Sequence, residues 1–181
     1  VVVPQRAILR LCSGDYLPWG PDLRFLLLAP LSFDASTLEL WGPLLHGGIC
    51  VVHPEPKMTF SGLRRVLREE RINCLWLTAG LFNHLVDEEP EILAPVEYVL
   101  TGGEALSVPH VRRALAALPG THLLNGYGPT EATTFTCTYR IPRNEPLGTS
   151  IPIGRPLPRT TCRVLDAQRR PVPAGTSGEL Y

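Results

Sequence analysis

The chain has 181 residues, 44% of them apolar, so it can bury a core of ordinary size and lacks the composition of a disordered segment. Its 17 Lys and Arg residues are interspersed with 17 Asp and Glu residues, which leaves no basic field for nucleic acid or an anionic membrane. No apolar stretch is long enough to cross a bilayer, and the first residues carry no signal-peptide pattern. We therefore expect a globular protein of the cytoplasm.

Short, nearly continuous apolar runs recur along the chain and are separated by turn residues. Runs of this kind are typical of strands covered on both faces of a sheet. The predicted strands are residues 25–29, 49–52, 74–77, 98–100 and 122–124.

Segments with helical spacing lie between these runs. Leu63, Val66 and Leu67 form an apolar stripe among charged neighbours, which predicts a helix with one wet face. In the segment 107–120, Ser107 is a possible N-cap, and a proline in the first turn and a closing glycine mark the ends of a helix. Because strands and helices alternate, the predicted fold is α/β, with a mostly parallel sheet flanked by helices.

The texture of the sequence changes after about residue 136. Helical spacing disappears, and prolines interrupt short β-prone pieces such as Thr161 to Leu165. We expect an α/β subdomain over residues 1–135 and the start of a small β-rich subdomain over residues 136–181. Both ends of the chain look cut, so we expect both subdomains to belong to one longer domain.

Polar and glycine-rich turns follow the predicted strands. Ligands of open α/β sheets bind beyond the carboxyl ends of the strands, so these turns are the places to search for a site. Asp34 follows the first run and stands at the mouth of a helix, Gly102-Gly103-Glu104 follows the run 98–100, and the segment 125–131 follows the run 122–124. A sheet order that brings these turns together would create one rim with carboxylates, hydroxyls and aromatic rings.

Each of these turns also has a purely structural explanation. Asp34 is a residue that often caps a helix, and a lone pair of glycines is an ordinary turn. The segment 125–131 is more specific, because its glycines let the backbone approach a flat ligand on which Tyr127 could stack. Thr130 and Glu131 add possible phosphate and magnesium contacts. Composition and spacing thus indicate an α/β nucleotide-binding fold.

The segment 125–133, Asn-Gly-Tyr-Gly-Pro-Thr-Glu-Ala-Thr, is similar to the central signature of the adenylate-forming enzymes. This superfamily includes acyl-CoA ligases, luciferases and the adenylation domains of nonribosomal peptide synthetases. The segment 31–36 resembles an upstream motif of the amino-acid-activating branch, and the segments 153–157 and 178–181 resemble later motifs in matching order. By this resemblance the chain is identified as an internal piece of an adenylation domain of a nonribosomal peptide synthetase.

The resemblance implies roles for the matched nucleotide residues. Tyr127 would stack on adenine, Asn125 would help to hold the base, Thr130 would meet the α-phosphate, and Glu131 would bind Mg²⁺. Thr130 and Glu131 form the implied catalytic pair. The implied nucleotide-binding set is Gly102, Gly103, Glu104, Asn125, Gly126, Tyr127, Gly128 and Thr130.

In the amino-acid-activating branch, the residue matching Asp34 takes the α-ammonium group of the substrate. Apart from Asp34, the implied pocket is uncharged, with bulky side chains that shorten it and small residues that leave limited room near the α-carbon. Among family pockets it looks most like those for valine or a similar aliphatic amino acid. The implied substrate-binding set is Asp34, Ala35, Leu38, Trp76, Leu100, Gly102, Gly126, Thr134 and Phe135.

The implied reaction uses ATP and Mg²⁺ to form an aminoacyl-AMP, which is then transferred to the phosphopantetheine thiol of a carrier protein. The implied partners are a peptidyl carrier domain and a condensation domain of the parent synthetase. The family's phosphate loop would precede Val1, and its lobe with the catalytic lysine would follow Tyr181, so we expect the chain alone to be inactive. The alternatives are an acyl- or aryl-acid CoA ligase of the same superfamily and a non-catalytic nucleotide-binding module.

Overall fold

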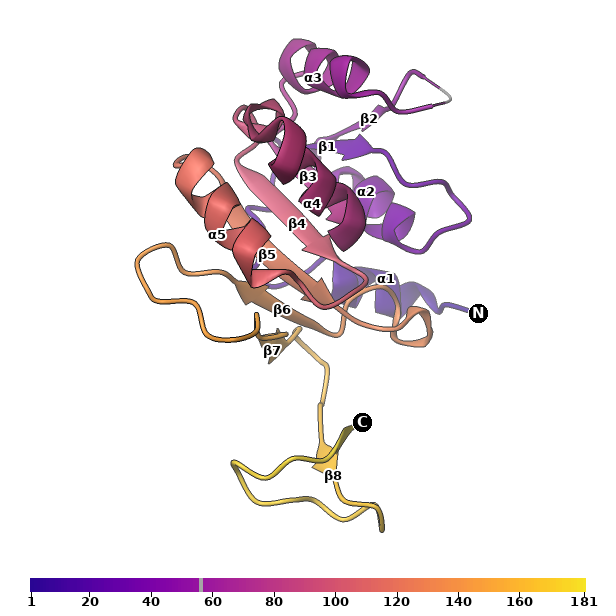
Figure 1. Ribbon diagram of the computed structural model, residues 1–181. Helices are drawn as coiled ribbons and strands as arrows, with labels where there is room; N and C mark the ends of the chain where they lie inside the picture. Colours follow the sequence, from indigo (N-terminus) through magenta and orange to yellow (C-terminus); the bar gives the residue numbers. More distant parts are fainter. Residues whose placement is uncertain (56) are drawn as a thin grey trace.

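The computed structural model describes residues 1–55 and 57–181 and contains a seven-stranded sheet with the order β2-β1-β3-β4-β5-β6-β7 (Figure 1). The first five strands run parallel, while β6 is antiparallel to β5 and β7 is antiparallel to β6. The predicted mostly parallel sheet is confirmed. The strands are β1 (Arg24–Leu27), β2 (Ile49–Val52), β3 (Cys74–Thr78), β4 (Tyr98–Gly102), β5 (His122–Tyr127), β6 (Cys137–Arg140) and β7 (Arg155–Pro156).

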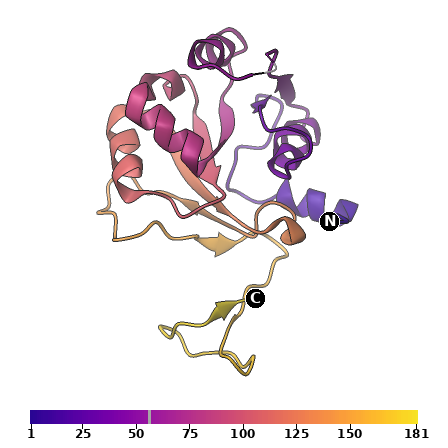
Figure 2. The ribbon, with the colours of Figure 1, turned by 45° about the vertical axis from the view of Figure 1, so that its right-hand side comes forward.

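Helices cover both faces of this sheet. Helices α3, α4 and α5 lie over one face, and α1 and α2 lie over the other (Figures 1 and 2). Among the described residues, no helix has the length and apolar character needed to span a membrane. The helices are α1 (Gln5–Leu11), α2 (Ala35–Leu44), α3 (Phe60–Glu69), α4 (Ala79–Glu88) and α5 (Val108–Ala117), with 3₁₀ turns η1 (Pro90–Leu93) and η2 (Thr130–Ala132).

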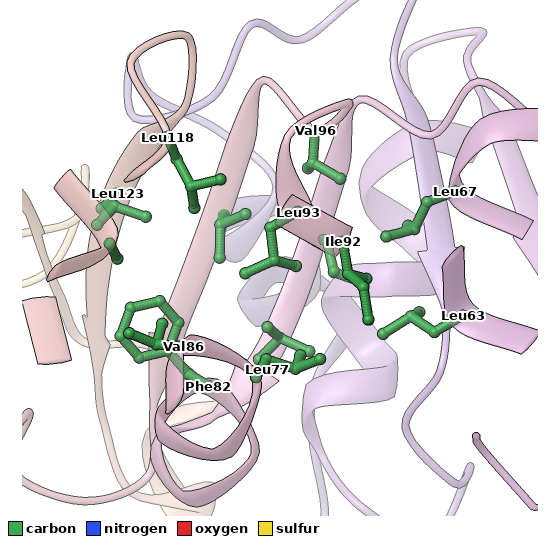
Figure 3. Close-up of a cluster of buried hydrophobic side chains, with 14 of the residues drawn as sticks. Leu63, Leu67, Leu77, Phe82, Val86, Ile92, Leu93, Val96, Leu118 and Leu123 are labelled. Atoms are coloured by element: carbon green, nitrogen blue, oxygen red, sulfur yellow. The ribbon is translucent and has the colours of Figure 1, made fainter. Parts of the chain in front are cut away.

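The alternation of side chains along the strands divides the apolar residues between two cores. Leu75 and Leu77 of β3 point into the core beneath α3, α4 and α5, which Figure 3 shows in part. Cys74 and Trp76 of the same strand point into the core beneath α1 and α2. Burying one such side chain contributes about 1.5–3 kcal/mol, so both helical layers are held to the sheet by burial.

Local capping explains where two of the helices begin. The hydroxyl of Thr59 accepts a hydrogen bond from the amide of Gly62 at the start of α3, and Thr78 caps α4 in the same way. Ser107 stands at the N-cap of α5, but its hydroxyl lies 2.6 Å from Nδ1 of His110 and caps no backbone amide. The sequence therefore predicted the N-cap position of α5 correctly, although the Ser107 hydroxyl contacts His110 instead of a backbone amide.

The main sheet continues past residue 135, where the sequence suggested a boundary. Strands β6 and β7 add to the β5 edge, so residues up to Pro156 belong to the same sheet. A proline is tolerated there because β7 is the last strand and its outer side needs no partner. The separate antiparallel sheet consists of β8 (Val164–Leu165) and β9 (Glu179–Leu180), and it lies apart from the main body (Figure 2).

Candidate nucleotide and substrate site

Strands β4 and β5 are neighbours, and the register places Gly102 opposite Gly126 at their carboxyl ends. A Cβ atom on Gly102 would lie 2.1 Å from the carbonyl oxygen of Gly126, and one on Gly126 would lie 2.5 Å from the ring of Phe135. Side chains are therefore excluded at both positions by close backbone and ring packing. At Gly126 the space expected to be open in the substrate pocket is filled by the Phe135 ring.

A cleft of about 360 Å³ lies beside these two glycines. Tyr127 is 40% exposed and lines the cleft, so it presents surface to a ligand there. Two of the predicted nucleotide residues do not line the cleft: Gly102 is buried and directly precedes the lining residue Gly103, and Thr130 is exposed and directly follows the lining residue Pro129. The lining residues are Gly103, Glu104, Ala105, Asn125, Gly126, Tyr127, Gly128, Pro129, Ile151 and Ile153.

The far wall of the cleft was not identified from the sequence. Asn125 is 5% exposed and donates a hydrogen bond from Nδ2 to the carbonyl oxygen of Pro152 over 2.9 Å. This bond fixes the segment that brings Ile151 and Ile153 to the cleft. The Nδ2 group of Asn125 thus already has a protein partner, whereas the sequence assigned the residue only to the base. The motif at 153–157 was the signal that could have pointed to this wall.

The turn after the cleft holds the backbone in an unusual conformation. Thr130 and Glu131 are exposed in η2, and the two residues that follow this turn, Thr133 and Thr134, have φ angles of 61° and 63°. This left-handed conformation is unfavourable for β-branched residues and costs on the order of 1–3 kcal/mol at each position. Both threonines are buried, so surrounding contacts must hold the turn in place.

The residues of the predicted substrate pocket come together behind this turn. The hydroxyl of Thr134 donates to the backbone carbonyl oxygen of Asp34 over 2.9 Å. Asp34 stands at the N-cap of α2, but its carboxylate accepts no hydrogen bond from an amide of this helix. Helix capping by the side chain, the structural explanation considered for Asp34, is therefore not observed. The remaining side chains share the core beneath α1 and α2: Ala35, Leu38, Trp76, Leu100 and Phe135.

Two aromatic features of this pocket were missed in the sequence. The ring of Phe33 lies 5.5 Å from that of Trp76, centroid to centroid, and remains 39% exposed beside Asp34. Nε1 of Trp76 is buried and has no hydrogen-bond partner among the described residues. The predicted substrate residues are therefore flanked by an aromatic pair beside Asp34.

Glu39 of α2 anchors the loop that leads from β1 to Asp34. It is fully buried, and its Oε2 accepts hydrogen bonds from the amides of Leu28 and Ala29 over 3.1 and 2.9 Å. Burial raises the pKa of the Glu39 carboxyl to about 8, and the two amide bonds oppose this rise. Its position on an otherwise apolar helix face was the only sequence signal for such a role.

Two exposed carboxylates lie at or next to the cleft, namely Glu104 in its lining and Glu131 in η2. Among residues 1–55 and 57–181, no group of three or more His, Cys, Asp or Glu side chains is arranged as a metal cluster. Mg²⁺ is commonly held by one or two carboxylates together with substrate phosphates, so the exposed Glu131 beside Thr130 fits this ion.

The geometry described so far is that of a nucleotide-binding α/β protein, with its cleft at the carboxyl ends of parallel strands. A family model described as "AMP-binding enzyme" matches residues 1–181. The chain belongs to the AMP-binding enzyme family.

Relatives and solved structures are consistent with this membership. The chain is 45% identical to a polypeptide of the linear gramicidin synthase of Brevibacillus parabrevis, over 100% of this chain and 2% of that polypeptide. It is 39% identical to malpibaldin synthetase of Mortierella alpina, covering 100% of this chain and 3% of the synthetase. The expected resemblance to nonribosomal peptide synthetases is confirmed.

Among solved structures, PA1221, a nonribosomal peptide synthetase protein containing adenylation and PCP domains, superposes with a TM-score of 0.89 at 45% identity, over 96% of this chain and 36% of that chain. The N-terminal subdomain of Klebsiella oxytoca NpsA in complex with 3-hydroxybenzoyl-AMSN superposes with a TM-score of 0.85 at 28% identity, over 97% of this chain and 43% of that chain. The chain thus spans less than half of each of these solved chains.

Proposed function

We propose that this chain supplies the amino-acid pocket and one wall of the ATP site in an adenylation domain that forms an aminoacyl-AMP. The observation that carries the proposal is the position of Asp34. Its carboxylate caps no helix, and its backbone is tied through Thr134 to the turn that borders the nucleotide cleft. A counter-charge for an α-ammonium group therefore stands next to a site suited to a nucleotide.

In the proposed reaction, a carboxylate oxygen of the amino acid attacks the α-phosphorus of ATP. A bond forms between this oxygen and the α-phosphorus. The bond between the α-phosphorus and the oxygen that bridges the α- and β-phosphates breaks, and pyrophosphate leaves with that oxygen. Mg²⁺, when bound, offsets the charge of the phosphates. The residues of this chain act by position: Tyr127 holds the base, Thr130 contacts the α-phosphate, Glu131 binds the metal and Asp34 holds the ammonium.

The proposed substrate is valine or a similar aliphatic amino acid. Asp34 is the only charged residue in the proposed pocket, so a charged side chain would lose its hydration without gaining a partner. The bulky Leu38, Trp76 and Phe135 are all buried and favour a compact substrate. One methylene in such a pocket is worth only about 1–3 kcal/mol, so isoleucine, leucine and 2-aminobutyrate should be activated less efficiently but measurably.

The aminoacyl group would next pass to the phosphopantetheine thiol of a peptidyl carrier domain. The presence of a PCP domain in PA1221 supports this partner. A condensation domain in the parent synthetase and a cytoplasmic location remain predictions, as do the two subdomains divided near residue 135.

Pyrophosphate exchange by the complete parent polypeptide, measured with each proteinogenic amino acid, tests this function. We expect exchange to be highest with valine. A preference for an aromatic, charged or amide side chain would refute the substrate assignment and leave the reaction standing. Exchange with acyl or aryl acids alone would favour the CoA-ligase alternative, and ATP binding without exchange would favour a non-catalytic module.

A further inference from the structure

Arg10 of helix α1 contacts the segment 132–135, which lies between the proposed nucleotide residues and the proposed amino-acid residues. Its Nη2 donates to the carbonyl oxygens of Ala132 and Thr133 over 2.6 and 3.1 Å. Its Nη1 donates to the carbonyl oxygen of Phe135 over 2.9 Å and to Oγ1 of Thr160 over 3.0 Å. One guanidinium therefore binds three carbonyl groups of the segment 132–135, which is more than a hundred residues away in the sequence.

These carbonyl groups belong to the strained part of the turn. The left-handed conformation of Thr133 and Thr134 turns successive carbonyl groups toward one region, and a turn of this kind persists only when its surroundings hold it. Arg10 supplies donors at that region, since its side chain is partly buried and forms no ion pair with a carboxylate among the described residues. Its charge is therefore directed at the carbonyl groups of the turn.

The turn carries groups from both halves of the proposed site. Glu131 directly precedes the first carbonyl that Arg10 binds, and Thr134, whose hydroxyl binds the Asp34 carbonyl, lies between the last two. Movement of this segment would displace the nucleotide side and the amino-acid side together. The sequence motifs contain no sign of this connection, because α1 lies before all of them.

We propose that Arg10 is a positioning residue that fixes the segment 132–135 and thereby aligns Glu131 with the Asp34 pocket. This inference rests on the proposed function for its effect on activity. The shape of the guanidinium is essential to it, because two separate nitrogens must reach acceptors on both sides of the turn. A lysine ammonium offers a single centre and cannot replace both.

The test compares Arg10→Lys and Arg10→Ala with a matched control, Arg6→Ala, in the complete parent polypeptide. Arg6 lies on the same helix, is exposed and has no side-chain hydrogen bond among the described residues. The first readout is amide hydrogen exchange over residues 132–136, which needs no activity. The second is pyrophosphate exchange with separate kcat and KM values for ATP and for the amino acid, together with the melting temperature.

We expect the amide hydrogens of residues 132–136 to exchange faster in both Arg10 variants than in the wild type. The amide hydrogens of β3, β4 and α4 should keep the protection that they have in the wild type. We expect kcat/KM to fall roughly ten- to a hundredfold for both substrates. The preference for the best amino acid over its nearest competitor should narrow, and Arg6→Ala should behave as the wild type.

Unchanged exchange over residues 132–136 in a folded Arg10→Lys protein would overturn the inference. So would a loss of activity that tracks the fall in melting temperature across all variants, because that pattern marks general destabilisation. If the wild type shows no pyrophosphate exchange, the proposed function fails, and the amide exchange of the turn still decides the role of Arg10.

Discussion

The hydroxyl of Thr134 donates a hydrogen bond to the carbonyl oxygen of Asp34, which joins two loops 100 residues apart in the sequence. Thr134→Val keeps the branched shape and removes only the donor. We expect a loss of about 1 kcal/mol in the free energy of unfolding and a several-fold higher KM for the amino acid. Thermal denaturation and pyrophosphate exchange of the parent polypeptide measure both effects. Thr134→Ser, which retains the hydroxyl, should keep the amino-acid KM, and equal KM values in all three proteins would contradict the prediction.

Substitution of Asp34 should weaken amino-acid binding and leave the stability of the fold almost unchanged. Its carboxylate caps no amide of α2, so Asp34→Ala should change the free energy of unfolding by no more than about 0.5 kcal/mol. An α-ammonium left without its counter-charge in a dry pocket loses on the order of 3–5 kcal/mol. Amino-acid-dependent pyrophosphate exchange should therefore fall by about two to four orders of magnitude. Asp34→Asn, of nearly the same shape, should be equally impaired, and a normal KM for the amino acid in either variant would return Asp34 to a structural role.

Glu131 is exposed in η2, directly after the segment that lines the cleft, and its substitution should affect only the Mg²⁺ requirement. We expect Glu131→Gln to raise the Mg²⁺ concentration needed for half-maximal pyrophosphate exchange, because an amide is a much poorer magnesium ligand than a carboxylate. The melting temperature should stay the same. Glu91→Gln, an exposed change in η1 remote from the cleft, is the control. Equal Mg²⁺ dependence in both variants would remove Glu131 from the metal site.

Glu39 should make stability depend on pH. Burial raises the pKa of its carboxyl from 4.5 to about 8 in the folded protein, so between these values the folded state binds a proton that the unfolded state has released. Stability should therefore fall as the pH rises from about 4.5 to about 8, by up to about 1.4 kcal/mol per pH unit, and then level off. Denaturant unfolding of the parent polypeptide across this range measures the slope. Glu39→Gln should flatten it, and an unchanged slope in that variant would assign the effect to other groups.

Much of the fold could be predicted because its signals are local. The buried strands read as continuous apolar runs, and all of the runs predicted as strands became strands within a few residues. The continuation of the main sheet past residue 135 was harder to predict from the sequence. β6 pairs with β5 and the edge strand β7 pairs with β6, and the prolines of this region hide both short strands in the sequence.

The residues that the sequence did not reveal are those whose role depends on a distant partner. Arg10 reads as an ordinary helical arginine and Glu39 as a charged residue on a helix. Their importance appears only when the fold places Arg10 against the carbonyl groups of 132–135 and Glu39 against the amides of Leu28 and Ala29.

By itself the sequence determined the alternation of strands and helices, the glycine turns and the motif at 125–133, because backbone preference and side-chain periodicity act over a few residues. The tertiary structure alone decided which turns meet. The strand order sets Gly102 against Gly126, and the helix packing brings Arg10 to the turn at 132–135. Such contacts depend on the register and packing of segments far apart in the chain, which no local pattern specifies.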